Sequence, residues 1–448
     1  MSEWKKVKIG DFLTERQGRY KPNDEEISKY KRLDKIDFSG NIHISDKPTK
    51  TDMIIVFPGD LIISGINVAK GAISVYQGKE PVCATIHYSS YTFDDKKVDL
   101  DYFKYFVKSP AFIFALQQQV KGGIKTEIKP KHLLPLEISL PDLSTQKEIV
   151  KVLSKKIEKV ELIKSEIESQ KAYAKQLRQN ILQEAIEGKL TEEWRKGNPV
   201  VKGNPDFDAE ALFEKIQEEK CHTDSELLRN SKKKVFEPIL ENEQPFEIPE
   251  GWKWVRLGEI YTFSNGIASR GSEKGTLRPV LRLADLSTGT INLSEVREIK
   301  LTDNEFISHR VFKDDLIFIR VNGSKEKVGT AFLYEKDTPI SYCDHLFCGN
   351  KKALLVSSKF TMLEFNTVSV REQIMPLIKT TTGQNTINQG NMAIIKIPLP
   401  PLAEQKEIVS RVEKLLANVT ELEEQIAERE TLTKQLMQSI MKDAFREG

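Results

Sequence analysis

Two Glu-x-Lys triplets are the residues of this chain whose spacing best fits hydrolytic chemistry. Glu127-Ile128-Lys129 and Glu298-Ile299-Lys300 each place a carboxylate two residues from an amine, as in part of a metal-dependent nuclease site. Such triplets also arise by chance in a chain that is 30% charged. Because the two triplets occupy non-equivalent places in the two halves of the chain, we expect solvated charges here. A nuclease stays the enzymatic alternative.

Histidine and cysteine offer little metal chemistry. The chain has six histidines and four cysteines, and no second pair completes a zinc site around Cys343 and Cys348. We therefore expect no metal, reduced structural thiols and a cytoplasmic protein, since the start MSEWKKVKIGDF lacks the apolar core of an export signal. His87 and His345 are equivalent in the repeat described below. We expect them to be structural, with a nucleic-acid contact as the alternative.

Other catalytic signatures are missing from the sequence. There is no GxxxxGK[ST] phosphate loop, no glycine-rich cofactor turn, no GxSxG elbow and no HExxH helix. LPPL at 399–402 lacks the polar and aromatic residues of the stretch that amino-methyltransferases use. We therefore expect a chain that binds rather than catalyses.

The elements that position any functional residue occur twice. Three blocks recur: LPDLSTQKEIVKVLSKKI at 140–157 as LPPLAEQKEIVSRVEKLL at 399–416, Trp4–Asp11 as Trp252–Glu259, and VFPGDLII at 56–63 as VFKDDLIF at 311–318. Their offsets are 259, 248 and 255 residues, so the drift reflects small loop insertions. The chain is therefore two copies of one unit, a mixed domain followed by a long helix.

Each mixed domain reads as short strands joined by tight turns. MIIVFPGDLIISGI at 53–66 and RVFKDDLIFIRVNG at 310–323 are β-branched and apolar, with turns expected at Asp60 and Asp315. Helical patterns follow at 101–119 and 359–378, and glycine-bearing loops at 121–128 and 380–387. We predict a mixed α/β (α+β) fold with a strongly curved or barrel-like sheet in each copy.

The long helices carry a coiled-coil seam, because apolar residues step by three and four over about 45 residues. The seam residues are Val150, Leu153, Ile157, Val160 and Ile167 in the first helix and Val409, Val412, Leu416, Val419 and Ile426 in the second. Lys164 and Lys171 interrupt the first seam where Glu423 and Glu430 interrupt the second. If the helices pack together, these polar positions mix opposite charges. The alternative is that each helix lies on its own domain.

The predicted organisation has five parts. These are mixed domain 1–141, helix 142–190, acidic linker with short helices 191–250, mixed domain 251–400 and helix 401–448. Residues 1–135 carry 22 basic and 17 acidic groups, residues 251–397 carry 20 and 15, and residues 190–250 carry 9 and 15. Two mildly basic domains are compatible with a polyanionic partner, although charge of this size alone does not identify one.

Three segments together resemble a known family. LPPLAEQKEIVSRVEKLL, KQLRQNILQEAIEGKLTEEWR at 175–195 and IPEGWKWVRLGEI at 248–260 resemble the specificity subunit of type I restriction–modification systems, the HsdS family. The resemblance covers essentially the whole chain, in the family's order. Copy one departs from the family's LPPLxEQ with LPDLSTQ, where we expect Asp142 and Thr145 still to cap and open the helix.

The resemblance implies a function that the spacing alone does not. Each mixed domain would be a target recognition domain that reads one half of a bipartite, asymmetric DNA site. The helices would pack as an antiparallel coiled coil, set the gap and dock two methyltransferase subunits, with two restriction (motor–nuclease) subunits as possible further partners. S-adenosylmethionine, ATP and Mg²⁺ would belong to those partners, and this chain would be neither an enzyme nor a membrane protein.

Loops that differ between the copies are the candidates for contact with double-stranded DNA, because they are rich in groups that reach phosphates and base edges. The candidates are Arg16, Arg19, Lys21, Asn67, Lys70, Lys121 and Lys125 in copy one and Arg270, Lys274, Arg320, Asn322, Lys325, Lys327, Thr382, Gln384 and Asn385 in copy two. For each residue, a solvated loop position is the alternative. For the whole chain, the alternative is a stand-alone DNA-binding or architectural protein, or a coiled-coil adaptor.

Overall fold

The computed structural model divides into two compact units. Unit 1 comprises 1–170 and 425–448, and unit 2 comprises 171–424, so each long helix contributes to both. The structure describes residues 4–38, 40–47, 49–65, 72–119, 129–227, 236–268, 275–287, 290–351, 353, 355–381 and 383–445.

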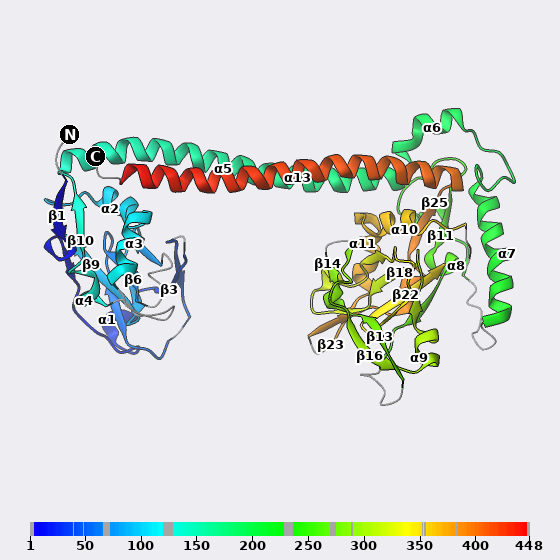
Figure 1. Ribbon diagram of the computed structural model, residues 1–448, viewed down its shortest axis with the longest axis horizontal. Helices are drawn as coiled ribbons and strands as arrows, with labels where there is room; N and C mark the ends of the chain where they lie inside the picture. The colour runs from blue at the N-terminus through cyan, green and yellow to red at the C-terminus, as the bar shows by residue number, and fades with distance from the viewer. Residues whose placement is uncertain are drawn as a thin grey trace. The chain divides into compact units, whose positions relative to one another are not determined.

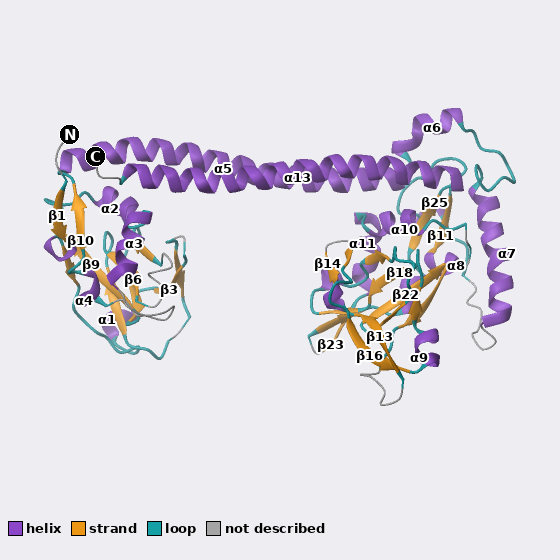
Figure 2. Cartoon of the chain, in the orientation of Figure 1, coloured by secondary structure: helices purple, strands orange, loops and turns teal. Residues whose placement is uncertain are grey.

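Unit 1 contains two four-stranded sheets and a two-stranded ribbon (Figures 1 and 2). One sheet has the order β2 (Leu13–Glu15), β9 (Tyr88–Phe93), β6 (Leu61–Ser64), β7 (Ile73–Val75), and the other β4 (Ile42–Ser45), β3 (Arg32–Ile36), β8 (Val82–Thr85), β5 (Met53–Val56). The ribbon pairs β1 (Lys5–Lys8) with β10 (Glu137–Leu140). The helices are α1 (Glu25–Ser28), α2 (Leu100–Phe106), α3 (Pro110–Gln119) and α4 (Pro130–Leu133).

Unit 2 repeats this arrangement. Its sheets have the orders β12 (Tyr261–Asn265), β22 (Leu346–Lys351), β18 (Leu316–Ile319), β20 (Ala331–Leu333) and β16 (Arg297–Leu301), β13 (Thr276–Leu281), β21 (Ile340–Tyr342), β17 (Arg310–Val311). Its ribbon pairs β11 (Lys253–Arg256) with β25 (Lys396–Leu399). The described part also has β14 (Leu286–Ser287) with β15 (Thr290–Ile291), and β19 (Val321–Asn322), β24 (Gln384–Thr386), β23 (Lys379–Thr381). The helices are α6 (Glu192–Gly197), α7 (Ala209–Leu227), α8 (Leu257–Ile260), α9 (Asp303–Ser308), α10 (Ser358–Phe365), α11 (Val368–Ile374) and α12 (Gln389–Ala393).

The strand registers follow the sequence repeat. Leu61 lies opposite Tyr91 in unit 1, and Leu316 lies opposite Gly349 in unit 2, at offsets of 255 and 258 residues. The mixed α/β prediction is therefore confirmed in both copies. The barrel-like form of that prediction is wrong, because the described strands form small open sheets and no closed barrel.

The turns expected at Asp60 and Asp315 are present. The two carboxylates accept the backbone N–H of Phe57 at 3.0 Å and of Phe312 at 2.8 Å. The residue before each aspartate is left-handed, with φ of 89° at Gly59 and 67° at Asp314. Glycine and aspartate tolerate this conformation, so both copies build the same turn from different residues.

The helical stretches predicted at 101–119 and 359–378 are helical, but each is divided into two shorter helices, α2 and α3 in copy one and α10 and α11 in copy two. Ser109 lies between α2 and α3 and caps α3 by accepting the N–H of Phe112 at 3.2 Å. Thr367 does the same between α10 and α11, at 3.4 Å from the N–H of Val370. A hydroxyl cap supplies an alternative partner for helix-terminal N–H groups, so the chain breaks there.

The helices α5 (Leu143–Ile186) and α13 (Leu402–Ala444) pack together in antiparallel fashion (Figure 1). In unit 1, Leu153 near the start of α5 shares a core with Met441 and Phe445 at the end of α13. In unit 2, Ile181 near the end of α5 shares a core with Val412 near the start of α13. This confirms the predicted helix pair. Among the described helices, none is long and apolar enough to cross a membrane.

The repeated LPxLxxQ motif closes the turn from strand to helix. The side-chain amides of Gln146 and Gln405 are buried, and each donates at 2.8 Å to a carbonyl five residues upstream, on Pro141 and Pro400. Asp142 accepts the N–H of Thr145 at 2.8 Å, so the predicted cap is confirmed. The same motif therefore begins both helices, because a buried glutamine amide at the equivalent position fixes the start of each one.

Candidate nucleic-acid interface

The three most distinctive sequence segments meet at one buried carboxylate in unit 2. Glu404 is 1% exposed and accepts from Thr191 at 2.6 Å, Arg195 at 2.5 Å and the indole of Trp252 at 2.7 Å. These residues come from 399–416, 175–195 and 248–260. The shared motifs therefore build a structural junction, and the surfaces available for recognition lie elsewhere. Copy one has Thr145 in place of Glu404 and so lacks this carboxylate.

The candidate residues of copy two that the structure describes lie on one small sheet or next to its strands in the chain. Strands β19, β24 and β23 form this sheet, which joins the loop 320–327 to the segment 379–386. We call this group of residues the unit 2 cluster. Its predicted members are Arg320, Asn322, Lys325, Lys327, Gln384 and Asn385.

Three members of the unit 2 cluster hold its backbone in place. Asn385 is 8% exposed, donates to the carbonyl of Gly323 at 2.9 Å and accepts from Thr380 at 2.7 Å. Asn322 accepts the N–H of Ser324 at 2.9 Å. Arg320 donates to the carbonyl of Asp344 at 3.1 Å. These partners favour positioning roles over direct DNA contact for the three side chains.

The remaining members present polar ends to solvent. Lys327 and Gln384 are exposed, and Lys325 is half-buried. An amine suits phosphate oxygens, and a glutamine amide matches the donor and acceptor pair of an adenine edge. An exposed amine and an exposed amide in one segment group suit phosphate contact and base reading, respectively.

Sequence reasoning missed the exposed Lys379 and Thr381 of β23, which belong to the same sheet. The segment 380–387 was expected to be a loop, but it forms most of a hairpin with Gly383 at φ of 80°. The signal was present, because KTTTGQNT is a β-branched run with a glycine at its turn. Copy one has no such β-branched run at 121–128, which hid the hairpin.

Two groups of candidates stand outside the unit 2 cluster. In unit 1, Arg16 forms a bidentate pair with buried Asp60, at 2.5 and 3.0 Å, and its guanidinium lies 4.4 Å from the ring of Phe57. Arg19 and Lys21 are exposed. The other candidates lie outside the described residues: Asn67, Lys70, Lys121, Lys125, Arg270, Lys274 and Thr382. The pairing of Arg16 favours a structural role for it.

All ten seam residues face inward. Those that are buried are Leu153, Val160, Ile167, Val412 and Val419, and those that are half-buried are Val150, Ile157, Val409, Leu416 and Ile426. Among the polar seam positions, Glu423 pairs across the helices with Arg178 at 2.8 Å. Opposite charges thus meet between the helices. The partner of Glu423 is Arg178, and not one of the two lysines that the repeat placed at polar seam positions.

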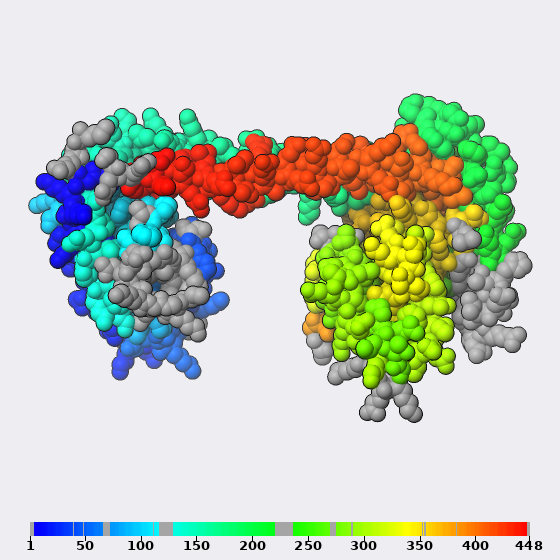
Figure 3. All heavy atoms as spheres, viewed as in Figure 1, coloured from blue at the N-terminus to red at the C-terminus, as the bar shows by residue number. Residues whose placement is uncertain are grey.

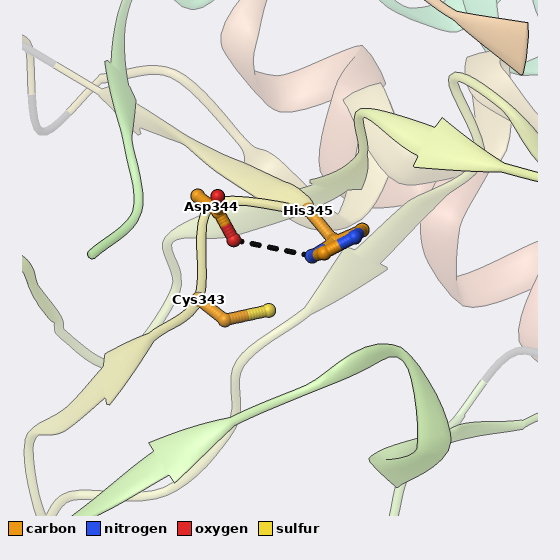
Figure 4. Close-up of side chains that lie close together, drawn as sticks. All are labelled: Cys343, Asp344 and His345. Carbon is orange, nitrogen blue, oxygen red and sulfur yellow. Dashed lines mark hydrogen bonds and ion pairs between the residues drawn. The ribbon is translucent and has the colours of Figure 1, made fainter. Parts of the chain in front are cut away.

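The turn between β21 and β22 carries a possible metal-binding trio (Figure 4). Ligand atoms of Cys343, Asp344 and His345 lie within 4.8 Å of one another, and Nδ1 of His345 is 3.1 Å from Oδ1 of Asp344. A structural zinc site takes four ligands, and the described residues bring no fourth into this group. Burial raises the pKa of the Cys343 thiol, which disfavours the thiolate that binds metal.

The nuclease triplet of copy two lies on β16, with Glu298 and Lys300 both exposed. Among the described residues, the Cys343 group is the one cluster of three or more metal-ligand side chains, so Glu298 has no companion carboxylates there. This geometry favours solvated charges. Glu127 and Ile128 of the other triplet lie outside the described residues.

Comparison with known proteins gives consistent relatives. The family model for the type I restriction modification DNA specificity domain matches residues 1–170 and 249–429. The EcoKI specificity subunit of Escherichia coli K12 is 27% identical over 397 residues, covering 87% of this chain and 75% of that protein. The StySPI specificity subunit of Salmonella potsdam is 27% identical over 395 residues, with the same coverage. A solved chain concerned with assembly and conformational transition of the type I R-M system shares the fold, with TM-score 0.62 at 16% identity over 99% of this chain and 98% of that chain.

Proposed function

The chain belongs to the type I restriction–modification DNA specificity family, and from this premise we propose that it selects the DNA sequence on which partner subunits act. Each mixed domain reads one half of a bipartite, asymmetric site in double-stranded DNA. The antiparallel helices α5 and α13 set the distance between the halves and dock two methyltransferase subunits. Restriction subunits are possible further partners.

The observation that carries this proposal is the duplicated fold with copy-specific surfaces. The two units share strand orders and registers, whereas the unit 2 cluster is built from residues that copy one does not repeat. Equivalent scaffolds suit equivalent partner subunits, and different loops suit different half-sites. A stand-alone adaptor has no need of two scaffolds that differ in their polar loops.

The chemistry is proposed to reside in the partners. S-adenosylmethionine, ATP and Mg²⁺ are assigned to the methyltransferase and motor–nuclease subunits, and this chain supplies binding and orientation alone. The sequence motifs are consistent with a chain that binds and orients, because the residues of the most distinctive motifs form the structural junction at Glu404.

The unit 2 cluster supplies a direct test on the complex assembled with its methyltransferase. Lys327→Ala removes an exposed amine, so we expect a loss of affinity of up to about tenfold and a salt dependence shallower by about one ion, whatever the DNA sequence. Gln384→Ala is expected to relax base preference at one position of one half-site. Binding is measured by fluorescence anisotropy across salt concentrations and substituted sites.

Lys336→Ala is the matched control, because Lys336 is exposed in the β20–β21 turn outside the unit 2 cluster. Equal losses for Lys327→Ala and Lys336→Ala would refute the assignment of this surface. So would an unchanged preference at every position of both half-sites for Gln384→Ala.

A further inference from the structure

The linker of unit 2 covers a surface whose counterpart in unit 1 is exposed. Three side chains of β11 contact linker residues. Lys253 pairs with Glu210 at 2.7 Å, and the ring of Trp254 lies 4.9 Å from that of Phe246. Arg256 donates to the carbonyl of Glu237. The linker therefore packs along this strand through both acidic and aromatic groups.

The neighbouring strand is covered by the same segment. Lys396 of β25 donates to the carbonyl of Glu243 at 2.8 Å, and its amine lies 3.9 Å from the carboxylate of that residue. The segment 236–250, FEPILENEQPFEIPE, has five glutamates and no basic residue. An extended acidic segment that carries phenylalanines thus covers the β11–β25 ribbon.

In unit 1, the β1 residues at the corresponding positions are Lys5, Lys6 and Lys8, and all three are exposed. None of them forms an ion pair with a residue that the structure describes. In Figure 3 the dark-blue atoms of this strand lie at the surface of unit 1, and the green atoms of the linker lie against unit 2. Strand β1 thus presents lysines where β11 is covered, whereas on β10 Glu137 stands in the place of Lys396, directly across from Lys8.

A pocket beside this ribbon is suited to an aromatic side chain. It has a volume of about 350 Å³ and lies where Lys6 stands in place of Trp254. Its lining includes the aromatic residues Trp4, Phe106, Phe112 and Phe445 and one charged residue of each sign, Lys6 and Glu137. The aromatic lining suits a phenylalanine ring, and Lys6 suits a carboxylate next to that ring on the β1 side of the pocket.

The starts of the two long helices differ in the same way, because the linker contacts the start of α13 and a groove lies on the start of α5. In unit 2, the N–H groups of Leu402 and Ala403 donate to the linker carbonyls of Pro205 and Asp206, at 3.0 and 3.2 Å. In unit 1, a groove of about 660 Å³ on the first turns of α5 is lined by Lys147, Lys151, Lys155 and Lys156, among others. The first turns of α5 thus carry four lysines and one carboxylate, Glu148, along this groove.

We propose that the β1–β10 ribbon of unit 1 and its aromatic pocket dock an extended, acidic, phenylalanine-bearing segment of a partner subunit. The segment occupies in trans the surface that 236–250 occupies in cis on unit 2. Its carboxylates pair with the β1 lysines, and one aromatic ring enters the pocket. This docking rests on the proposed function only in that the segment belongs to another subunit of the complex.

The test uses the full chain and a fluorescein-labelled peptide of residues 236–250. We expect saturable binding by anisotropy that Lys6→Glu/Lys8→Glu weakens about tenfold, because two attractive charges become repulsive. Lys79→Glu/Lys96→Glu alters the same net charge at exposed sites of unit 1 and is expected to bind normally. A peptide with Phe246→Ala is expected to bind more weakly to the unaltered chain.

Absence of saturable binding, or equal weakening by both double variants, would overturn the inference. Self-association of the chain that Lys6→Glu/Lys8→Glu abolishes would also overturn it, because the occupant would then be a second copy. DNA selectivity of the assembled complex is measured in parallel. Loss of DNA selectivity with peptide binding intact would count against the proposed function. Loss of peptide binding with DNA selectivity intact would count against the docking surface alone.

Discussion

At the scale of single residues, the repeated motifs are explained by buried polar groups with fixed partners. Gln146 accepts the N–H of Asp99 at 2.7 Å and donates to Pro141 at 2.8 Å, so one side chain ties α2 and the strand end to α5. Burying an amide is tolerable only when its hydrogen bonds are made. The residue is repeated because no apolar residue can replace both bonds.

Gln146→Ala is predicted to lower the free energy of unfolding by about 1–3 kcal/mol, because it leaves a buried N–H and a buried carbonyl without partners. Urea denaturation measures the change. Gln77→Ala is the control, since Gln77 is exposed, and is expected to change stability by less than about 0.5 kcal/mol. Similar stabilities for the two variants would show that the amide bonds are dispensable.

Asp315 and Asp60 hold equivalent turns in different electrostatic surroundings. Asp60 pairs with Arg16, but Ser264 stands at the equivalent position beside Asp315, which instead accepts an amide hydrogen of Asn350 at 3.2 Å. Burial raises the pKa of Asp315 to about 6. The folded chain therefore binds more protons than the unfolded chain between about pH 4 and pH 6, so this group lowers stability as pH rises through that window.

Asp315→Asn is accordingly predicted to stabilise the protein by about 1–3 kcal/mol above pH 6, where the buried carboxylate is ionised, and to have little effect near pH 4. Asp60→Asn is the comparison and is predicted to destabilise, because it breaks the pair with Arg16. Urea denaturation from pH 4 to pH 8 separates the two. A pH-independent difference between Asp315→Asn and the unaltered chain would contradict the burial of an ionisable group.

At the scale of elements, the seam of α5 and α13 is the feature that the sequence specifies most fully. Leu153 is 1% exposed within the unit 1 core, whereas its neighbour Val152 is 51% exposed. Leu153→Ala is predicted to cost about 2–4 kcal/mol of unfolding free energy, and Val152→Ala less than about 0.5 kcal/mol. Denaturation of both variants checks this. Equal costs would mean that the seam does not bury Leu153 in solution.

Pattern periodicity explains what was predictable among the elements. The three-and-four spacing fixed both long helices, and the repeat fixed equivalent strands in the two copies. The split of 101–119 and 359–378 was missed, because Ser109 and Thr367 act as caps only through local hydrogen bonds within apolar runs. The β19–β24–β23 sheet was missed, because its strands come from segments about 60 residues apart. Periodicity does not report such pairings.

The candidate site was predictable only in part for the same reason. Residue types singled out Asn385, but its buried contacts with Gly323 and Thr380 depend on the tertiary fold. Lys379 begins a β-branched run with a glycine at its turn, but that run was read as a loop because copy one does not repeat it. The junction at Glu404 was unforeseen, because the three segments that meet there are distant in sequence. A motif thus indicated the family without indicating which of its residues face DNA.

At the scale of the whole molecule, the chain is two related units joined by shared helices, and it belongs to a family of specificity subunits. In the proposed function, the two copies of the scaffold read two half-sites, and the copy-specific loops make these half-sites different. The acidic linker covers one ribbon and leaves the other exposed, so the two copies are expected to differ in the partner segments that they accept.

The central claim is tested most directly by mapping methylated bases in cells that carry the candidate methyltransferase with and without this chain. The account predicts a new two-part motif with a fixed gap that is methylated only when the chain is present. A Gln384→Ala chain is expected to alter one half of that motif and leave the other half and the gap unchanged. Unchanged methylation in the presence of an active, assembled methyltransferase would contradict the account.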